Sequence, residues 1–196
     1  MKDRTRVNLV ISSDDRKFIT LLNTESCKID GRYQVPLPLH SKSFIVPNNR
    51  EQVLQRMVWL KENSTENRKF YEDYCAFMND IVSKGYAEKM PKEQIDSKEN
   101  IWYIPHHGVY HPKKPEKIRV VYNCSAKFSG TSLNNQLIQG PDLTSTLIGV
   151  LIRFRQEPVA FTADIESMFY QVRVPENQRN LLRFLWWPDG DITKNV

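Results

Sequence analysis

An acidic residue stands at the end of a largely apolar run late in the chain. Asp164 directly follows Val159–Ala163 and lies two residues before Glu166. A carboxylate where a buried strand meets solvent is costly unless it accepts hydrogen bonds or holds a cation. Carboxylate and carbonyl oxygens are also the ligands that hard divalent cations prefer. The residue types therefore allow a divalent-cation site, and an aspartate that caps a helix or closes a turn is the alternative.

Basic residues are concentrated in residues 105–127. This stretch contains Glu116 as its one acid and five basic residues, Lys113, Lys114, Lys117, Arg119 and Lys127. Such a stretch attracts phosphate groups without sequence preference and makes binding depend on salt. On charge alone, a solvated turn without a ligand is the favoured alternative.

Three of the four histidines lie in the same basic stretch, at positions 106, 107 and 111. No cysteine or carboxylate stands near them at a spacing that suits zinc. We therefore expect these residues to be turn histidines with satisfied hydrogen bonds.

Two helices are expected to precede the basic stretch. Asn48 and Asn49 can cap a helix that continues through Glu62, and a second helix is expected over residues 65–83, with Gly85 as its left-handed stop. The apolar stripes of the two helices are Val53, Met57 and Leu60, and Phe70, Tyr74, Phe77 and Ile81. Residues 1–47 are expected to be irregular because prolines interrupt them, and residues 91–100 have the composition of a polar linker.

The second half of the chain predicts strands. Short runs rich in β-branched and aromatic residues occur at 101–104, 118–122, 159–163, 169–174 and 181–187. Pro112 and Pro115 flank a turn between the first two runs, which predicts a hairpin with lysines at or near its tip. One helix is expected to begin at Pro141-Asp142 and to end before Pro158. Strands and helices in this order predict an α+β fold.

The composition is that of an ordinary globular chain. The 196 residues carry a formal net charge of +5, and 40% of them are hydrophobic. No window approaches 18 consecutive apolar residues, so we expect no transmembrane helix. Three widely spaced cysteines and the lack of a signal peptide indicate free thiols and an intracellular, cytoplasmic protein.

Six motifs occur in one fixed order along the second half. They are YIPHHGVYHP (103–112), KIRVVYNCSAK (117–127), SLN (132–134), QGPDL (139–143), ADIESMFYQV (163–172) and LRFLWWP (182–188). Together they closely resemble the reverse transcriptase of BEL/Pao-type long-terminal-repeat retrotransposons. The upstream DGRY (30–33), LPL (37–39), PNNR (47–50) and KGYAEK (84–89) resemble the segment that precedes the polymerase in that family's polyprotein.

This resemblance implies roles for particular residues. Reverse transcriptases use two Mg²⁺ ions, held by carboxylates, to join a deoxynucleoside triphosphate to a primer. Asp164 matches the first of these carboxylates, and the carbonyl of Ile165 would add a metal ligand. Phe169 matches the aromatic residue under the incoming sugar. Arg119 matches the residue that clamps the triphosphate, and Lys113 or Lys114 would provide a second phosphate contact.

The sequence also departs from the family. After Asp164 the only aspartates are Asp189 and Asp191, in a turn-like Pro-Asp-Gly-Asp stretch, and no Tyr-x-Asp-Asp motif is present. One of three carboxylates cannot hold two metal ions. We therefore expect that this chain alone does not polymerise DNA. We also expect an open palm-sheet edge that leaves Phe184, Trp186 and Trp187 partly exposed.

The leading interpretation is a fragment of a right-hand polymerase. Residues 1–99 would form a helical extension that precedes the polymerase, and residues 100–196 would form the fingers hairpin and the first part of the palm sheet. The implied partners are an RNA template, an RNA–DNA hybrid, a deoxynucleoside triphosphate and the rest of the Pol polyprotein, with no membrane, and an active element would place the protein in a virus-like particle. The alternatives are a non-catalytic nucleic-acid-binding remnant and, less favoured, a structural protein of capsid type.

Overall fold

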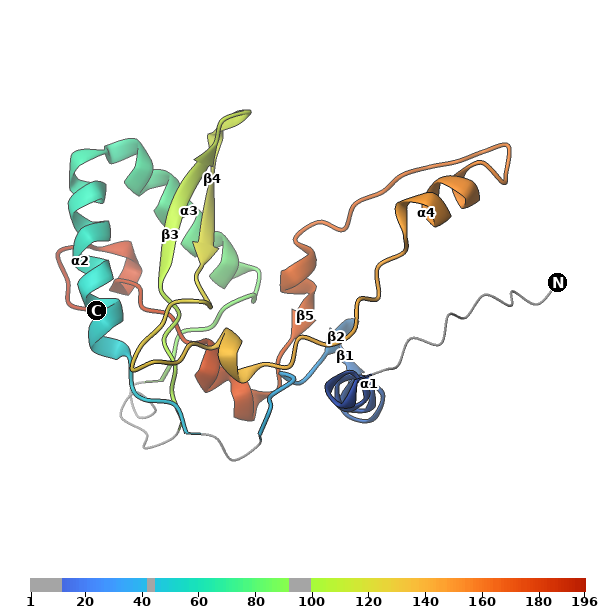
Figure 1. Cartoon of the computed structure of the whole chain (residues 1–196). Coiled ribbons are helices and arrows are strands. Elements are labelled where there is room, and N and C mark those ends of the chain that lie inside the picture. Colours follow the sequence, from blue (N-terminus) through green and yellow to red (C-terminus); the bar gives the residue numbers. More distant parts are fainter. Residues whose placement is uncertain (1–11, 42–44, 92–99) are drawn as a thin grey trace. The chain divides into compact units, whose positions relative to one another are not determined.

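The computed structural model describes residues 12–41, 45–91 and 100–196, and its fold is of mixed α+β type, as expected (Figure 1). The chain forms two compact units. Unit 1 comprises Met1–Pro38 and Ile138–Arg173, and unit 2 comprises Leu39–Leu137 and Val174–Val196. Each unit therefore combines residues from both sides of the expected boundary after residue 99, and the functional division at that point stays a prediction. Most of the expected linker, residues 92–99, lies outside the described residues.

Unit 1 begins with regular structure where the sequence predicted none. Helix α1, Ser13–Glu25, starts at a capping box in which Ser12 and Asp15 each accept a hydrogen bond from the other's backbone N–H. Strands β1, Cys27–Ile29, and β2, Arg32–Gln34, then form an antiparallel hairpin. Asp30 and Gly31 at its turn both have positive φ, as a two-residue hairpin turn requires. The expectation of an irregular segment over residues 1–47 was wrong for residues 13–34, because the interrupting prolines all lie downstream of this hairpin. It is confirmed for residues 35–41 and 45–47, which form no helix and no strand beyond an isolated bridge at Leu39, and residues 1–11 and 42–44 lie outside the described residues.

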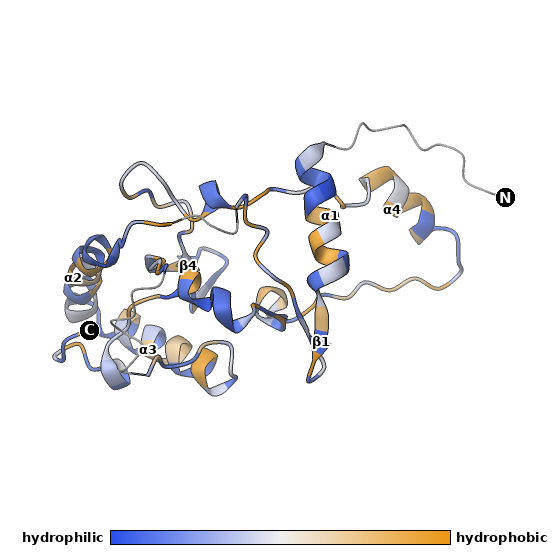
Figure 2. Cartoon of the chain, turned by 90° about the horizontal axis from the view of Figure 1, so that it is seen from below, coloured by the Kyte–Doolittle hydropathy of each residue, from blue (hydrophilic) through white to orange (hydrophobic). Residues whose placement is uncertain are grey.

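The later part of unit 1 contains fewer strands than expected. Helix α4, Leu147–Phe154, begins at the cap Thr146 rather than at Pro141, because Asp142 closes a local turn by accepting hydrogen bonds from Thr144. The run Val159–Ala163 is extended but has no strand partner, so the predicted strand there is wrong. A 3₁₀ helix occupies 168–171, and the remaining strand β5, Val172–Arg173, pairs in parallel with β2. Figure 2 shows α4 as mostly hydrophobic.

Unit 2 contains the two predicted helices, α2, Arg50–Glu66, and α3, Arg68–Ser83, separated only by Asn67. The predicted apolar stripe of α2 is buried. On α3 the predicted Tyr74 and Ile81 are buried, but Phe70 and Phe77 are only half-buried, and Met78 is buried instead of Phe77. Gly85 has a φ of +66°, which confirms the left-handed stop.

Asn49 does not cap α2 with its side chain. It is fully buried, and its amide makes two hydrogen bonds to the backbone of Tyr103, accepting from the N–H at 2.8 Å and donating to the carbonyl at 2.7 Å. This bidentate contact occupies the backbone groups that one edge of a strand would present. On the other edge Trp102 and Ile104 donate to the carbonyls of Asn180 and Arg183, but the pairing amounts to an isolated bridge between Tyr103 and Arg183, so the predicted strand at 101–104 is wrong.

The predicted hairpin is present, but its first strand starts later. Strand β3, His106–His111, pairs antiparallel with β4, Lys114–Tyr122, and the pairing is irregular after Tyr110. Of the expected strand at 169–174, only Val172–Arg173 is a strand, and the residues before it form a 3₁₀ turn. The expected strand at 181–187 is absent: its first two residues end the 3₁₀ turn Glu176–Leu182, and the others form no helix or strand beyond the isolated bridge at Arg183. Trp187 is buried, which corrects its expected exposure, while Phe184 and Trp186 are half-buried.

Two global expectations can be compared with the described residues. All three cysteines are free thiols, as expected. Within residues 12–41, 45–91 and 100–196, no helix is both long and apolar enough to cross a membrane.

Candidate nucleic-acid interface on the β3–β4 hairpin

The inner face of the hairpin packs against α3. In the observed register Gly108 faces Val120 and Tyr110 faces Ile118, and both Ile118 and Val120 are buried. A Cβ atom at Gly108 would lie 2.8 Å from Ile118, 2.9 Å from Phe70 and 3.0 Å from Tyr74. Only glycine lets the strand approach the aromatic face of α3 this closely. The contact therefore fixes which side of the hairpin is buried.

His106 anchors the base of the hairpin in an aromatic cluster. Its Nε2 lies 2.8 Å from the carbonyl oxygen of Leu185. Because a carbonyl oxygen can only accept a hydrogen bond, Nε2 carries the proton of the ring. The other ring nitrogen, Nδ1, therefore accepts a hydrogen bond from the Tyr74 hydroxyl. Burial lowers the pKa of His106 to about 4 and raises the pKa of Tyr74, so both groups are neutral at pH 7. The expectation of a histidine with satisfied hydrogen bonds is confirmed at position 106, although it lies in a strand rather than a turn.

The outer face of the hairpin carries cations. Because side chains alternate along a strand, Lys117 and Arg119 lie on the side opposite Ile118 and Val120, and Arg119 pairs across the ladder with the exposed Val109. Lys113 lies in the turn and Lys114 is the first residue of β4. The hairpin thus brings the three expected phosphate-binding residues, Lys113, Lys114 and Arg119, onto one protruding element.

These cations have no acidic partners within the described part of the chain. Lys113, Lys114, Lys117 and Arg119 are all exposed, and none of them makes an ion pair with a described residue. Other lysines and arginines, such as Lys17, Arg68 and Lys84, pair with carboxylates on their own helices. The one acid of the hairpin, Glu116, makes no ion pair with a described residue, and the hairpin keeps a net positive charge that is available to an anionic ligand.

The residues expected to contact the metal ions and the sugar belong to unit 1, whereas the hairpin residues belong to unit 2. Asp164 is exposed, and its Oδ1 accepts a hydrogen bond from the Ile165 N–H at 2.9 Å. Phe169 lies in the 3₁₀ helix and is 82% exposed. The predicted strand before Asp164 is absent, so its carboxylate does not end a buried strand as the sequence suggested. Its printed hydrogen bond goes only to the next residue, and Asp164 lies in neither a helix nor a turn, so the alternative of a capping or turn-closing aspartate stays a prediction.

The donor set around Asp164 does not fit two Mg²⁺ ions. Within the described ranges, no group of three or more histidine, cysteine or acidic side chains is placed to hold a metal ion. Two-metal sites need several carboxylates to balance the charge of the cations. Of the residues that the resemblance implies as metal ligands, the described part of the chain provides one carboxylate, Asp164, together with the Ile165 carbonyl.

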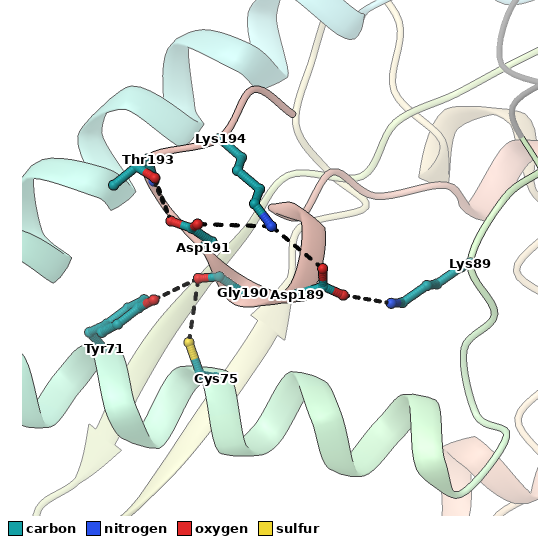
Figure 3. Close-up of polar contacts among 8 residues, drawn as sticks. All are labelled: Tyr71, Cys75, Lys89, Asp189, Gly190, Asp191, Thr193 and Lys194. Atoms are coloured by element: carbon teal, nitrogen blue, oxygen red, sulfur yellow. Dashed lines mark hydrogen bonds and ion pairs between the residues drawn. The ribbon is translucent and has the colours of Figure 1, made fainter.

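The two aspartates that follow Asp164 in the sequence, Asp189 and Asp191, take part in a structural turn, as expected for Pro-Asp-Gly-Asp (Figure 3). Asp189 pairs with Lys89 at 3.2 Å and with Lys194 at 3.6 Å, and the hydrogen bond and charge of Lys89 lower the pKa of its carboxyl. The carbonyl of Gly190 accepts a hydrogen bond from the Tyr71 hydroxyl at 2.6 Å. These partners could not be predicted from local spacing, because Lys89 lies 100 residues from Asp189 and Tyr71 lies 119 residues from Gly190 in the chain.

No protein-family model, no curated protein and no solved structure matches the chain.

Proposed function

We propose that the chain is part of an RNA-directed DNA polymerase of the BEL/Pao retrotransposon type, and that the β3–β4 hairpin is its phosphate-binding fingers element. In this proposal Arg119 contacts the triphosphate of an incoming nucleotide, and Lys113 and Lys114 contact phosphates of the nucleotide or of the RNA–DNA hybrid. A planar guanidinium suits bidentate phosphate contacts, whereas the lysines act as point charges.

One observation carries the proposal. The three residues that the resemblance implies as phosphate ligands lie on one hairpin, are exposed and have no carboxylate partner among the described residues. A carboxylate beside an exposed cation offsets its positive potential, so such a cation attracts phosphate less strongly. No described carboxylate pairs with the hairpin cations, so their positive potential is not offset in this way.

In unit 1 the proposal assigns a role to three residues only. Asp164 would supply one carboxylate for Mg²⁺, the Ile165 carbonyl one further oxygen, and Phe169 the contact beneath the sugar. The remaining carboxylates would have to come from a Tyr-x-Asp-Asp segment, which this sequence does not contain. We therefore expect no primer extension by the chain alone, with or without Mg²⁺.

A second candidate function is non-catalytic binding of nucleic acid. It is favoured by a contrast: four exposed hairpin cations make no ion pair with a described residue, whereas the exposed Asp164 belongs to no metal-binding group within the described residues. Such binding would follow the phosphate backbone and would show no base preference. Both candidates require the hairpin, and they differ in whether a chain extended through a Tyr-x-Asp-Asp motif polymerises DNA.

Binding of a labelled RNA–DNA hybrid, followed by fluorescence anisotropy at low salt, tests the shared requirement. The variant Lys113→Ala/Lys114→Ala/Arg119→Gln removes three unpartnered charges. The control Lys17→Ala/Arg68→Ala/Lys84→Ala removes three charges that have carboxylate partners on their own helices. We expect at least about a tenfold loss of affinity in the hairpin variant and a much smaller change in the control. Equal losses in the two variants would show that net charge, and not the hairpin, determines binding.

A further inference from the structure

Among the described residues, exposed apolar side chains are most concentrated in one stretch of unit 1, residues 147–163. In α4 the six large hydrophobic side chains, at positions 147, 148, 150, 151, 152 and 154, are 45–72% exposed. In the segment that follows, Val159 is 79% exposed and Phe161 is 86% exposed. A helix that is hydrophobic on all sides is ordinarily buried, and no described residue of the chain buries this one.

The backbone after α4 also has no partner. Residues 159–163 belong to the drawn-out trace that follows α4, form no helix or strand, and make no backbone hydrogen bond with any described residue (Figure 1). Val159 and Phe161 share one side of this segment, because side chains alternate along extended backbone. An unpaired, uncharged stretch of this kind is a template for pairing with another strand. A lipid surface would not satisfy its N–H and C=O groups, so a polypeptide partner is favoured over a membrane.

We propose that residues 147–163 form an interface between two copies of this chain, in which residues 159–163 of each copy pair antiparallel across a two-fold axis and the two α4 helices cover Val159 and Phe161. Two identical segments that pair antiparallel make the same contacts in both directions, which is what a two-fold interface requires. The segment from Pro158 to Ala163 carries no charge, so self-pairing brings no like charges together within it.

The exposed area is sufficient for such a dimer. Eight side chains that are about two-thirds exposed present roughly 500 Å² of apolar surface, at about 60–120 Å² for each fully exposed side chain. One partner of a standard interface contributes about 800 Å², of which about 57% is apolar, or roughly 450 Å². The stretch therefore offers the apolar area of a complete interface.

Sedimentation velocity of the whole chain over a wide concentration range tests this proposal. Ile148→Lys/Phe161→Lys places charges in the proposed interface, and Val58→Lys/Trp59→Lys places the same charges at exposed apolar positions on α2 as a control. Ala160→Pro keeps the apolar surface but removes a backbone N–H from the pairing segment. Circular dichroism and the fluorescence of the tryptophans, all of which lie in unit 2, verify that unit 2 stays folded in every variant.

We expect a discrete dimer for the native chain and for the control, and at least a tenfold weaker dimer for the interface and proline variants. A monomer at every concentration would overturn the proposal. Polydisperse aggregates that persist in the proline variant would also overturn it, because they require apolar surface without strand pairing. Co-sedimentation with phospholipid vesicles that is lost only in the Lys variant would assign the surface to a membrane instead. Failure of this proposal leaves the hairpin function untouched, since no hairpin residue is involved.

Discussion

Replacement of Asn49 by alanine should destabilise unit 2 far more than the same change at its neighbour Asn48. Asn49 is fully buried and satisfies both backbone groups of the buried Tyr103, with hydrogen bonds of 2.7 and 2.8 Å. Asn49→Ala leaves the N–H and the carbonyl of Tyr103 without a partner. Each orphaned buried group costs about 1–3 kcal/mol, so we expect the free energy of unfolding to fall by about 3 kcal/mol.

The neighbouring asparagine provides the control. Asn48 is exposed, and its side chain accepts one hydrogen bond, at 3.0 Å, from the Arg50 N–H. Water can replace that bond, so Asn48→Ala should cost less than about 1 kcal/mol. Urea denaturation followed by tryptophan fluorescence measures both changes. If Asn49→Ala proved no more destabilising than Asn48→Ala, the bidentate contact would not hold residues 100–106 against α2.

Two further predictions concern the hairpin core. The folded-state pKa of His106 is about 4, below its usual 6.5, so the unfolded chain binds more protons in this range and stability falls as pH decreases. We expect a loss of about 1.6 kcal/mol between pH 6.5 and 5, because the slope rises towards 1.36 kcal/mol for each pH unit only below the unfolded pKa. Urea denaturation measures the loss, and His106→Gln should give a clearly flatter profile. A profile that is as steep in the variant would contradict the assignment. Gly108→Ala should lower the free energy of unfolding by about 1–3 kcal/mol, because its Cβ would lie within 3.0 Å of three side chains. Val109→Ala on the outer face should cost less than about 1 kcal/mol. A larger loss for Val109→Ala than for Gly108→Ala would contradict the assignment of the inner and outer faces.

The elements that follow from local signals could be predicted from the sequence. The apolar spacing of Val53, Met57 and Leu60 predicts α2 and its buried face, and Gly85 marks the end of the α3 region. The hairpin was expected from its β-branched residues and flanking prolines. Its first strand starts later than predicted, at His106. Histidines are weak strand signals, and the backbone of Tyr103 is hydrogen-bonded by the side chain of Asn49, just before α2.

Elements that depend on distant partners could not be predicted. The run Val159–Ala163 has the composition of a strand, but a strand forms only where another strand pairs with it. Helix α1 had a readable signal in Ser12 and Asp15, which was outweighed by prolines that lie beyond the helix. Of the candidate site, the basic hairpin followed from the sequence. The role of Asn49 and the ion pairs of Asp189 did not, since their partners are more than fifty residues away.

The measurement that tests the central claim most directly is the salt dependence of binding to the RNA–DNA hybrid. Each phosphate contact contributes a slope of about −0.9 to the plot of log association constant against log salt concentration for duplex DNA. Lys113→Ala/Lys114→Ala/Arg119→Gln should therefore flatten the slope of the native chain by about two to three. The control Lys17→Ala/Arg68→Ala/Lys84→Ala should leave it unchanged. Parallel lines for the native chain and the hairpin variant would contradict the claim that this hairpin grips phosphate.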